Sequence, residues 1–184
     1  MQLPDIASVG EVHDHPQRGL RRLRGVRVVV GVGLGVLVAA GLSACTAPVS
    51  VPVTPYADDP ICAEVVLALP RDLGDLSRLE TTSQATVAWG EPTGAIVLRC
   101  GVEPPEPTTD QCVDADDGST SVDWVAVPGQ EDAEGNAPWT FTTYGRSPAV
   151  EIRVPASVTA SRSTSFLLDL GPAVSRVEQT ASCL

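Results

Sequence analysis

The stretch AVEIRVP (Ala149–Pro155) has the clearest structural pattern in this chain of 184 residues. Three aliphatic residues, beginning with Val150, alternate with Glu151 and Arg153. Since successive side chains of a β-strand point to opposite faces, this order predicts a strand with one buried face and one face in water. Such strands are typical of antiparallel sheets, which can leave one face uncovered.

Four further stretches have a strand pattern and precede AVEIRVP in the chain. They are ATVAWG, AIVLRCG, VDWVAV and WTFTTYG, at residues 85–90, 95–101, 122–127 and 139–145. The segments 102–121 and 128–138 are rich in Pro, Gly and acidic residues and are expected to be loops. The chain therefore predicts a sheet of about five strands.

Helices are expected on both sides of these strands. Asp59 is a candidate N-cap and Pro60 a candidate first helical residue, followed by an apolar stripe to Leu69 and a stop at Pro70. Near the C-terminus, Pro172 is expected to begin a second helix. Helix, strands and helix together predict a single small α+β domain whose antiparallel sheet is covered on one face.

The N-terminal segment has the pattern of an export signal. Five arginines between residues 18 and 27 precede a run of 17 uncharged residues, 28–44, which ends in small side chains. This run is short for a permanent membrane span, which needs about 20 apolar residues. Residues 1–44 are therefore expected to be a signal peptide, the alternative being an uncleaved membrane anchor.

The residues Leu42-Ser43-Ala44-Cys45 resemble the lipobox of bacterial lipoproteins. The resemblance implies that the Cys45 thiol takes a diacylglycerol as a thioether and that the signal is cleaved before Cys45. The protein is then expected outside the cytoplasm, held by this lipid at the outer face of the cytoplasmic membrane. The Pro-rich segment 45–60 is expected to be an extended tether to a domain at 61–184; alternatively, residues 49–53 form a first edge strand.

Without Cys45, four cysteines remain, and an even number in an exported chain predicts two disulfides. A Pro-rich turn between Cys100 and Cys112 favours their pairing, which leaves Cys62 to pair with Cys183. No CxxC pair exists and no histidine follows His15, so no zinc site is expected. The acidic residues around Asp114 lack EF-hand spacing, and no metal or other cofactor is expected.

The charge pattern excludes several functions. Residues 45–184 contain seven arginines, no lysine and twenty carboxylates, a net charge of −13, which argues against binding to nucleic acid. His13 and His15 both lie in the expected signal peptide. The mature chain then has no histidine and no lysine, which excludes catalytic triads and Schiff-base chemistry. We therefore expect a protein that is not an enzyme.

Several strings resemble an actinobacterial lipoprotein family known as domain of unknown function 3515. They are AWGEP, VLRCGVEPP, VDWVAV, FTTYGRSPAVEIRVP and LLDLGPAVS, at residues 88–92, 97–105, 122–127, 141–155 and 167–175. The resemblance covers most of residues 61–184. It implies a lipoprotein of the cell envelope and supplies no catalytic residue.

Three functions remain open for such a protein. A non-catalytic binding or scaffolding module, with an envelope protein as partner, is favoured. The first alternative binds a small ligand in an aromatic and cationic groove, whose candidate residues are Trp89, Arg99, Trp124, Tyr144 and Arg146, with Trp139 beside them. Against the groove, large aromatics usually belong to the core of a small domain. The second alternative is a hydrolase with two carboxylates, for which Asp123 and Glu151 are no better candidates than other acidic residues.

Overall fold

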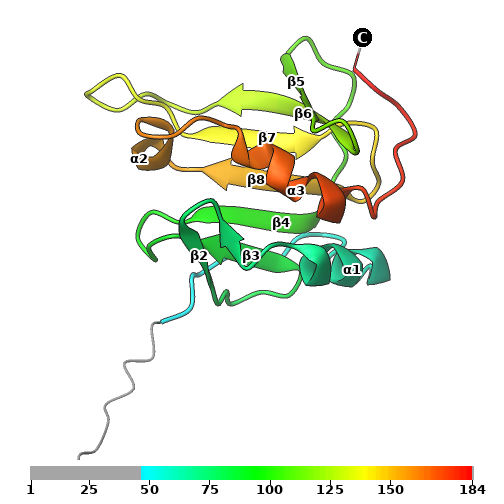
Figure 1. Cartoon of the computed structure of the whole chain (residues 1–184), viewed down its shortest axis with the longest axis horizontal. Coiled ribbons are helices and arrows are strands. Elements are labelled where there is room, and N and C mark those ends of the chain that lie inside the picture. The colour runs from blue at the N-terminus through cyan, green and yellow to red at the C-terminus, as the bar shows by residue number, and fades with distance from the viewer. Residues whose placement is uncertain (1–46, 184) are drawn as a thin grey trace, which may run out of the picture. The chain divides into compact units, whose positions relative to one another are not determined.

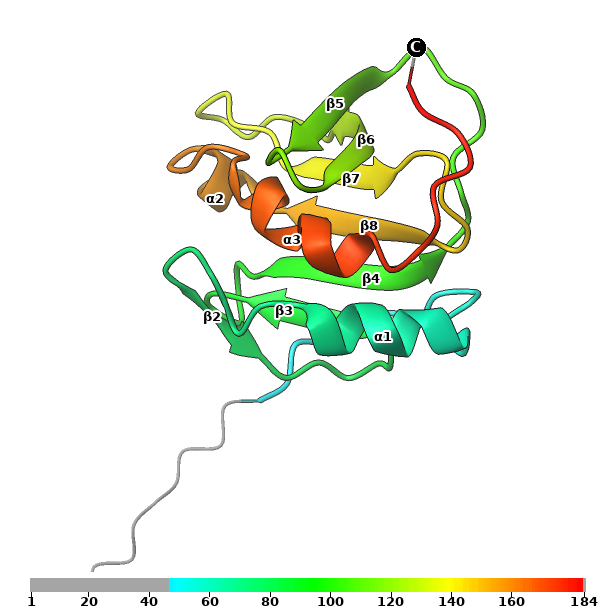
Figure 2. The same cartoon turned by 45° about the vertical axis from the view of Figure 1, so that its right-hand side comes forward.

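The computed structural model describes residues 47–183, and the expected signal peptide and Cys45 lie outside this range. The described part consists of one sheet with helices on one of its faces (Figures 1 and 2). The helices are α1 (Pro60–Ala68), α2 (Ala156–Thr159) and α3 (Phe166–Val174). The strands are β1 (Asp72–Leu73), β2 (Leu76–Leu79), β3 (Thr86–Trp89), β4 (Ile96–Val102), β5 (Gln111–Asp116), β6 (Ser121–Pro128), β7 (Trp139–Thr143) and β8 (Ala149–Val154). The predicted α+β class with an antiparallel sheet is confirmed.

The sheet has eight strands in the order β1-β2-β3-β4-β8-β7-β6-β5, and each neighbouring pair is antiparallel. Strands β1–β4 and β5–β8 each follow one another as a meander, and the two meanders join where β4 pairs with β8. The AVEIRVP stretch is therefore the strand that connects the two halves. Its alternation is as predicted: Val150, Ile152 and Val154 are buried, and Arg153 is exposed.

The expected number of about five strands was wrong. β1 and β2 are short, with two and four residues, and β5 lies within the segment expected to be a loop. β5 is an edge strand with mostly exposed side chains, including Asp114 and Asp116, so it lacks an apolar alternation. Pairing with β6 along its full length holds it in the sheet.

The first helix is as predicted. The Asp59 side chain accepts a hydrogen bond from the Ile61 N–H (3.0 Å), and Pro60 is the first helical residue. The helix ends at Ala68, since the residue before Pro70 is extended. The predicted C-terminal helix is present, but its expected start was wrong, because α3 begins at Phe166 and contains Pro172 near its end. Pro172 lies on the exposed side of α3, where solvent can satisfy the carbonyl that loses its partner.

The core lies between the sheet and the two longer helices. α1 packs against β4 and α3, and α3 packs against β5 and β6. The fully buried side chains include Trp89, Trp124, Leu98, Ile152 and Leu170. In residues 47–183 the longest helices have nine residues, and none is long and apolar enough to cross a bilayer.

Residues 49–57 are part of the domain, so the expected free tether was wrong for these residues. The Val49 N–H donates to the Glu80 carbonyl (2.8 Å), and the Val49 carbonyl accepts from the Thr82 N–H (3.0 Å). Val51 and Thr54 are buried, and the Thr54 hydroxyl donates to the Cys100 carbonyl (2.7 Å). The alternative, an edge strand over 49–53, agrees better with the structure, since Val49 forms one parallel bridge with Thr81.

This docked segment depends on a glycine in β4. Gly101 has φ +88°, and a Cβ there would lie 2.5 Å from the backbone carbon and oxygen of Tyr56. The Tyr56 N–H donates to the Gly101 carbonyl (2.9 Å) across the same approach. A side chain at position 101 would therefore push the N-terminal segment off the sheet.

The two predicted disulfides are present, but they connect different cysteines from those expected. Cys62 pairs with Cys100 and Cys112 pairs with Cys183, with Cα–Cα distances of 5.4 and 6.4 Å. The expected pairs required Cys100 and Cys112 to face each other across a turn. They lie in β4 and β5, and strands β8, β7 and β6 lie between them in the sheet.

We expect the two disulfides to differ in their reaction with dithiothreitol under native conditions. Cys62 and Cys100 are both 0 % exposed, whereas Cys112 is exposed and Cys183 half-buried. Because thiol–disulfide exchange requires access to a sulfur atom, Cys112 and Cys183 should be reduced first. Alkylation followed by peptide mapping should show label on these two cysteines, and on Cys62 and Cys100 only after denaturant is added. Equal labelling of all four in the native protein would contradict the structure.

Candidate functional site

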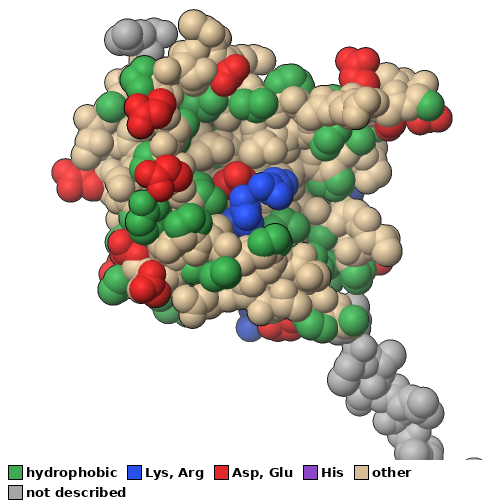
Figure 3. Space-filling model, turned by 180° about the vertical axis from the view of Figure 1, so that it is seen from behind, with side chains coloured by type: hydrophobic (Ala, Val, Ile, Leu, Met, Phe, Trp, Pro, Cys, Tyr) green, Lys and Arg blue, Asp and Glu red, His purple; other side chains and the backbone are tan. Residues whose placement is uncertain are grey.

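The helices leave one face of the sheet without a helical layer, and we call this the open face. Its central side chains are Val97, Arg99, Glu151, Arg153, Thr140, Thr142, Val125 and Val127. Figure 3 shows the protein from this side, with a patch of arginine near the middle of the face and most acidic side chains toward its rim. The open face therefore presents positive charge at its centre in a domain that is otherwise acidic.

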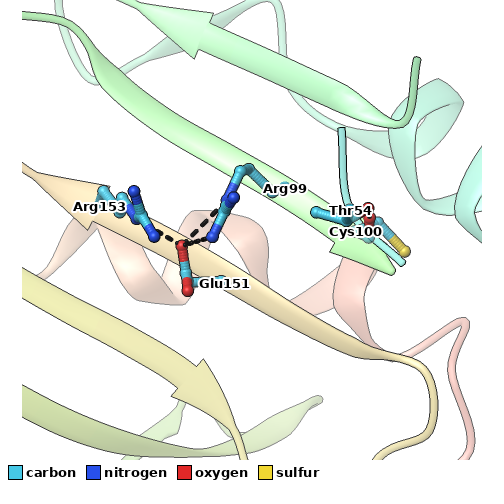
Figure 4. Close-up of polar contacts among 5 residues, drawn as sticks. All are labelled: Thr54, Arg99, Cys100, Glu151 and Arg153. Carbon is cyan, nitrogen blue, oxygen red and sulfur yellow. Dashed lines mark hydrogen bonds and ion pairs between the residues drawn. The ribbon is translucent and has the colours of Figure 1, made fainter. Parts of the chain in front are cut away.

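This patch is a cluster of three side chains from β4 and β8, Arg99, Glu151 and Arg153, which we call the arginine cluster (Figure 4). The Arg99 Nε and Nη2 atoms lie 3.0 and 2.7 Å from Glu151 Oε1. The Arg153 Nε atom lies 2.6 Å from the same oxygen. The register explains the contact, because Arg99 is directly opposite Glu151 and Arg153 follows two residues later on the same face.

The arginine cluster has one positive charge in excess and unused hydrogen-bond donors. Within residues 47–183, Arg99 Nη1 and both Nη atoms of Arg153 have no hydrogen-bond partner. The side chains of Arg99 and Glu151 are each 12 % exposed, whereas that of Arg153 is 54 % exposed. Partial burial reduces the screening of Arg99 by water and salt. The cluster is therefore suited to bind a further anionic oxygen.

A cavity of about 420 Å³ lies on the same side of the sheet, between the segment before β5 and the C-terminal tail. Its lining includes Thr108, Asp110, Cys112, Val125, Tyr144 and Cys183. Val125 is paired with Thr142, which is paired with Glu151. At about 4.8 Å per strand, the cavity wall is thus about 10 Å from the arginine cluster.

The structure does not assemble the predicted groove. Trp89 and Trp124 are both 0 % exposed and lie in the core under the helices, so their alternative interpretation as core residues is confirmed. The Trp89 Nε1 atom donates to the Pro70 carbonyl (3.2 Å). Trp139 stacks on Phe141 at the core edge, with ring centroids 6.1 Å apart. Of the five groove candidates, Arg99 belongs to the open face and Tyr144 to the adjacent cavity.

Arg146 is 4 % exposed and holds the C-terminal tail, so it is not a groove residue. Its Nη1 atom donates to the Val177 carbonyl, and its Nη2 atom to the Ser121 carbonyl (3.1 Å) and to Gln179 Oε1 (2.9 Å). Burial lowers the pKa of the Arg146 guanidinium, and the negative charge of Asp123 opposes this shift. The buried charge therefore has structural partners from β6 and from the tail.

The carboxylates considered for hydrolysis are bound to other groups. Asp123 Oδ2 accepts hydrogen bonds from Gln179 Nε2 (3.1 Å) and the Cys183 N–H (2.9 Å), while Glu151 binds the two arginines. Hydrogen bonds from Thr120 and Ser119 lower the pKa of Asp117 to about 2, the opposite of what a general acid requires. For these three carboxylates, the geometry therefore gives no support to a pair that works as acid and base.

One group of side chains in residues 47–183 has the proximity of metal ligands: Cys112, Asp123 and Cys183. The two sulfur atoms belong to one disulfide, and a disulfide offers no thiolate to a metal. The third member, Asp123, accepts hydrogen bonds from the tail. Their proximity is therefore explained by the attachment of the tail.

A comparison with protein families gives one decisive match. The model described as protein of unknown function (DUF3515) matches residues 25–183. The chain belongs to the DUF3515 family. We found no match among curated proteins and none among solved structures.

Sequence reasoning found only part of the site in this DUF3515 domain. It placed Glu151 and Arg153 on the solvent side of their strand and singled out Arg99, but it did not bring the three together. The missing information was that β4 pairs with β8, because each strand alone shows only which of its own residues share a face. The cavity around Tyr144 was also missed, since it requires the tail to return to β5.

Proposed function

We propose that this DUF3515 protein is a non-catalytic, lipid-anchored binding protein of the cell envelope, with the open face as its binding surface. The observation that carries the proposal is the arginine cluster, whose unused donors lie in the middle of a sheet face without a helical layer. A binding role agrees with the lack of histidine and lysine after residue 15 and with the hydrogen-bonded state of Asp123 and Glu151.

The ligand for such a surface carries a carboxylate or a phosphate. These groups match the planar donors of a guanidinium, and one net positive charge in the cluster attracts them. From the cluster, the ligand extends over Thr142 and Val125 into the cavity beside Tyr144. This surface differs from the groove expected in the small-ligand alternative. It includes Arg99 and Tyr144 of the candidate residues, but not Trp89, Trp124 or Arg146.

Two observations support the lipid anchor. Cys62, Cys100, Cys112 and Cys183 pair with one another, so neither disulfide requires Cys45. The family match begins at residue 25 and therefore includes the uncharged run and Cys45 as well as the folded domain. Both agree with the lipobox pattern, in which the cysteine has a separate chemical role.

The Cys45→Ala variant is expected to lose membrane attachment, because alanine has no sulfur to form the thioether. In cells, the variant should remain unprocessed and incorporate no labelled fatty acid. Thr46→Ala is the matched control and should behave like the wild type, with processing and partition into the detergent phase. Unchanged processing and attachment of Cys45→Ala would show that the anchor proposal is wrong.

Photocrosslinking on intact cells tests the binding surface. A photoreactive residue in place of Val127, on the open face, should give a specific adduct, whereas one in place of the exposed Ser161 should not. Adding Arg99→Gln and Arg153→Gln should reduce the Val127 adduct about tenfold, because a hydrogen bond to a charged group contributes about 1.5–3 kcal/mol. The same adduct from both positions, or no effect of the arginine substitutions, would contradict the proposed surface.

A further inference from the structure

Because residues 49–57 dock on the sheet, the domain must lie close to Cys45. Only Thr46, Ala47 and Pro48 separate Cys45 from Val49, which is hydrogen-bonded to Glu80 and Thr82. Four Cα–Cα steps of about 3.8 Å limit the distance from Cys45 to Val49 to about 15 Å. A domain of this size has a radius of gyration of about 14 Å. The link is thus too short for the domain to move away from its anchor.

Several large hydrophobic side chains are exposed in the N-terminal part of the described domain. Four large hydrophobic side chains are exposed in residues 47–183, and three of them, Val53, Tyr56 and Leu67, lie within the first 23 residues after Cys45. Leu67 is 85 % exposed on the outer side of α1. It lines an open cavity of about 510 Å³ together with the apolar residues Ala57, Ala63, Val66 and Ala85 and the acidic residues Asp58 and Asp59. The outer side of α1 therefore exposes apolar area to water.

The outer side of α1 and the attachment point lie at the same end of the domain. Figures 1 and 2 both show α1 and the cyan N-terminal segment at the lower end, beside β2 and β3. Strand β2 connects them: Arg78 donates to the Val66 carbonyl in α1 (3.4 Å), and Glu80, just after β2, accepts from Val49. A lipid attached at Cys45 would therefore bring this end of the domain to the bilayer.

We infer that the outer side of α1, with Leu67 in its last turn, contacts the outer surface of the cytoplasmic membrane. This inference rests on the proposed lipidation of Cys45. Contact with the bilayer removes the exposed leucine from water, which favours this orientation over others that the short link allows. Exposed Asp58 and Glu64 nearby, and Arg78 at the Val66 carbonyl, stay at the level of the headgroups, so the contact is interfacial.

Tryptophan fluorescence in vesicles tests this orientation. The lipidated protein would carry Leu67→Trp or, as matched control, Val127→Trp. Val127 is 43 % exposed and lies on the open face. β6 is four strands away from β3 in the sheet, about 19 Å. The vesicles contain phosphatidylcholine with bromine near the headgroup end of its acyl chains. Emission of the wild-type protein in the same vesicles is subtracted, and equal unfolding midpoints confirm that both variants are folded.

The added emission at position 67 should fall at least twofold relative to vesicles without bromine, and that at position 127 should not change. Two results from vesicle-bound protein would overturn the inference and leave the anchor intact. These are no quenching at either position, and equal quenching at both positions. Protein that carries no lipid and does not bind vesicles would instead overturn the anchor proposal and, with it, this inference.

Discussion

The double variant Cys62→Ala/Cys100→Ala is expected to lose about 4 kcal/mol of its free energy of unfolding. The disulfide closes a loop with a sequence separation of 38, for which chain entropy alone predicts about 4 kcal/mol. Both cysteines are fully buried, so the alanines also lose contacts between α1 and β4. Since small domains have a total stability of about 5–15 kcal/mol, this loss removes a large fraction of it.

Urea denaturation followed by circular dichroism measures this loss, and the variant Cys112→Ala/Cys183→Ala is the comparison. That disulfide closes a longer loop, with a separation of 71, and fastens the tail to an edge strand. The same chain-entropy estimate gives a loss of about 4 kcal/mol for it as well. Its removal should speed hydrogen exchange in residues 178–183, while the contacts of Arg146 and Asp123 still hold the tail to the folded core. A variant without Cys62 and Cys100 that keeps the wild-type midpoint would contradict the assigned pairing.

The parts of the fold that follow from local patterns could be predicted. The strand around Ile152 has strict alternation, and the first helix has a capping residue, a proline at its first position and an apolar stripe. These features depend on neighbours in the sequence. β1, β2 and β5 have no comparable pattern, because they are short or lie at the edge. Pairing with a neighbouring strand stabilises them, and a single sequence does not display this pairing.

The disulfide pairing could not be predicted for a related reason. The two cysteines nearest in sequence, Cys100 and Cys112, lie in strands that are separated by three others. Cys62 points from α1 toward β4, but its partner is decided by where the helix crosses the sheet. With four cysteines, three pairings agree with the sequence, and only the order of the strands selects one of them.

The candidate site shows the same limit at the level of single residues. Trp89 and Arg99 were grouped because of their chemistry, and the register then places them on opposite faces of the sheet. Arg146 was a candidate groove residue because of its chemistry. It is buried because the tail returns across that turn, where a Cβ at Gly145 would lie 1.8 Å from the Ala181 carbonyl oxygen. Such a return of the chain leaves no local signal in the sequence.

Arg146→Ala is expected to destabilise the protein by about 3–5 kcal/mol, the usual cost of breaking a buried charged network. The substitution leaves the Val177 and Ser121 carbonyls and the Gln179 side chain without their donor in a buried site. Asp123, which binds Gln179 and the Cys183 N–H, then loses the nearby positive charge. Arg146→Met, which keeps most of the volume, should not restore stability, since it donates no hydrogen bond.

The matched control is Arg153→Ala, because Arg153 has only one carboxylate partner and an exposed side chain. Exposed ion pairs contribute about 0–1 kcal/mol, so this variant should unfold close to the wild-type midpoint. If Arg146 held a ligand rather than the tail, Arg146→Ala would also retain the wild-type stability and would differ only in binding. A loss for Arg146→Ala with a stable Arg153→Ala therefore assigns the buried arginine to the attachment of the tail. Such a result leaves Arg99 and Arg153 as the candidate arginines for ligand binding.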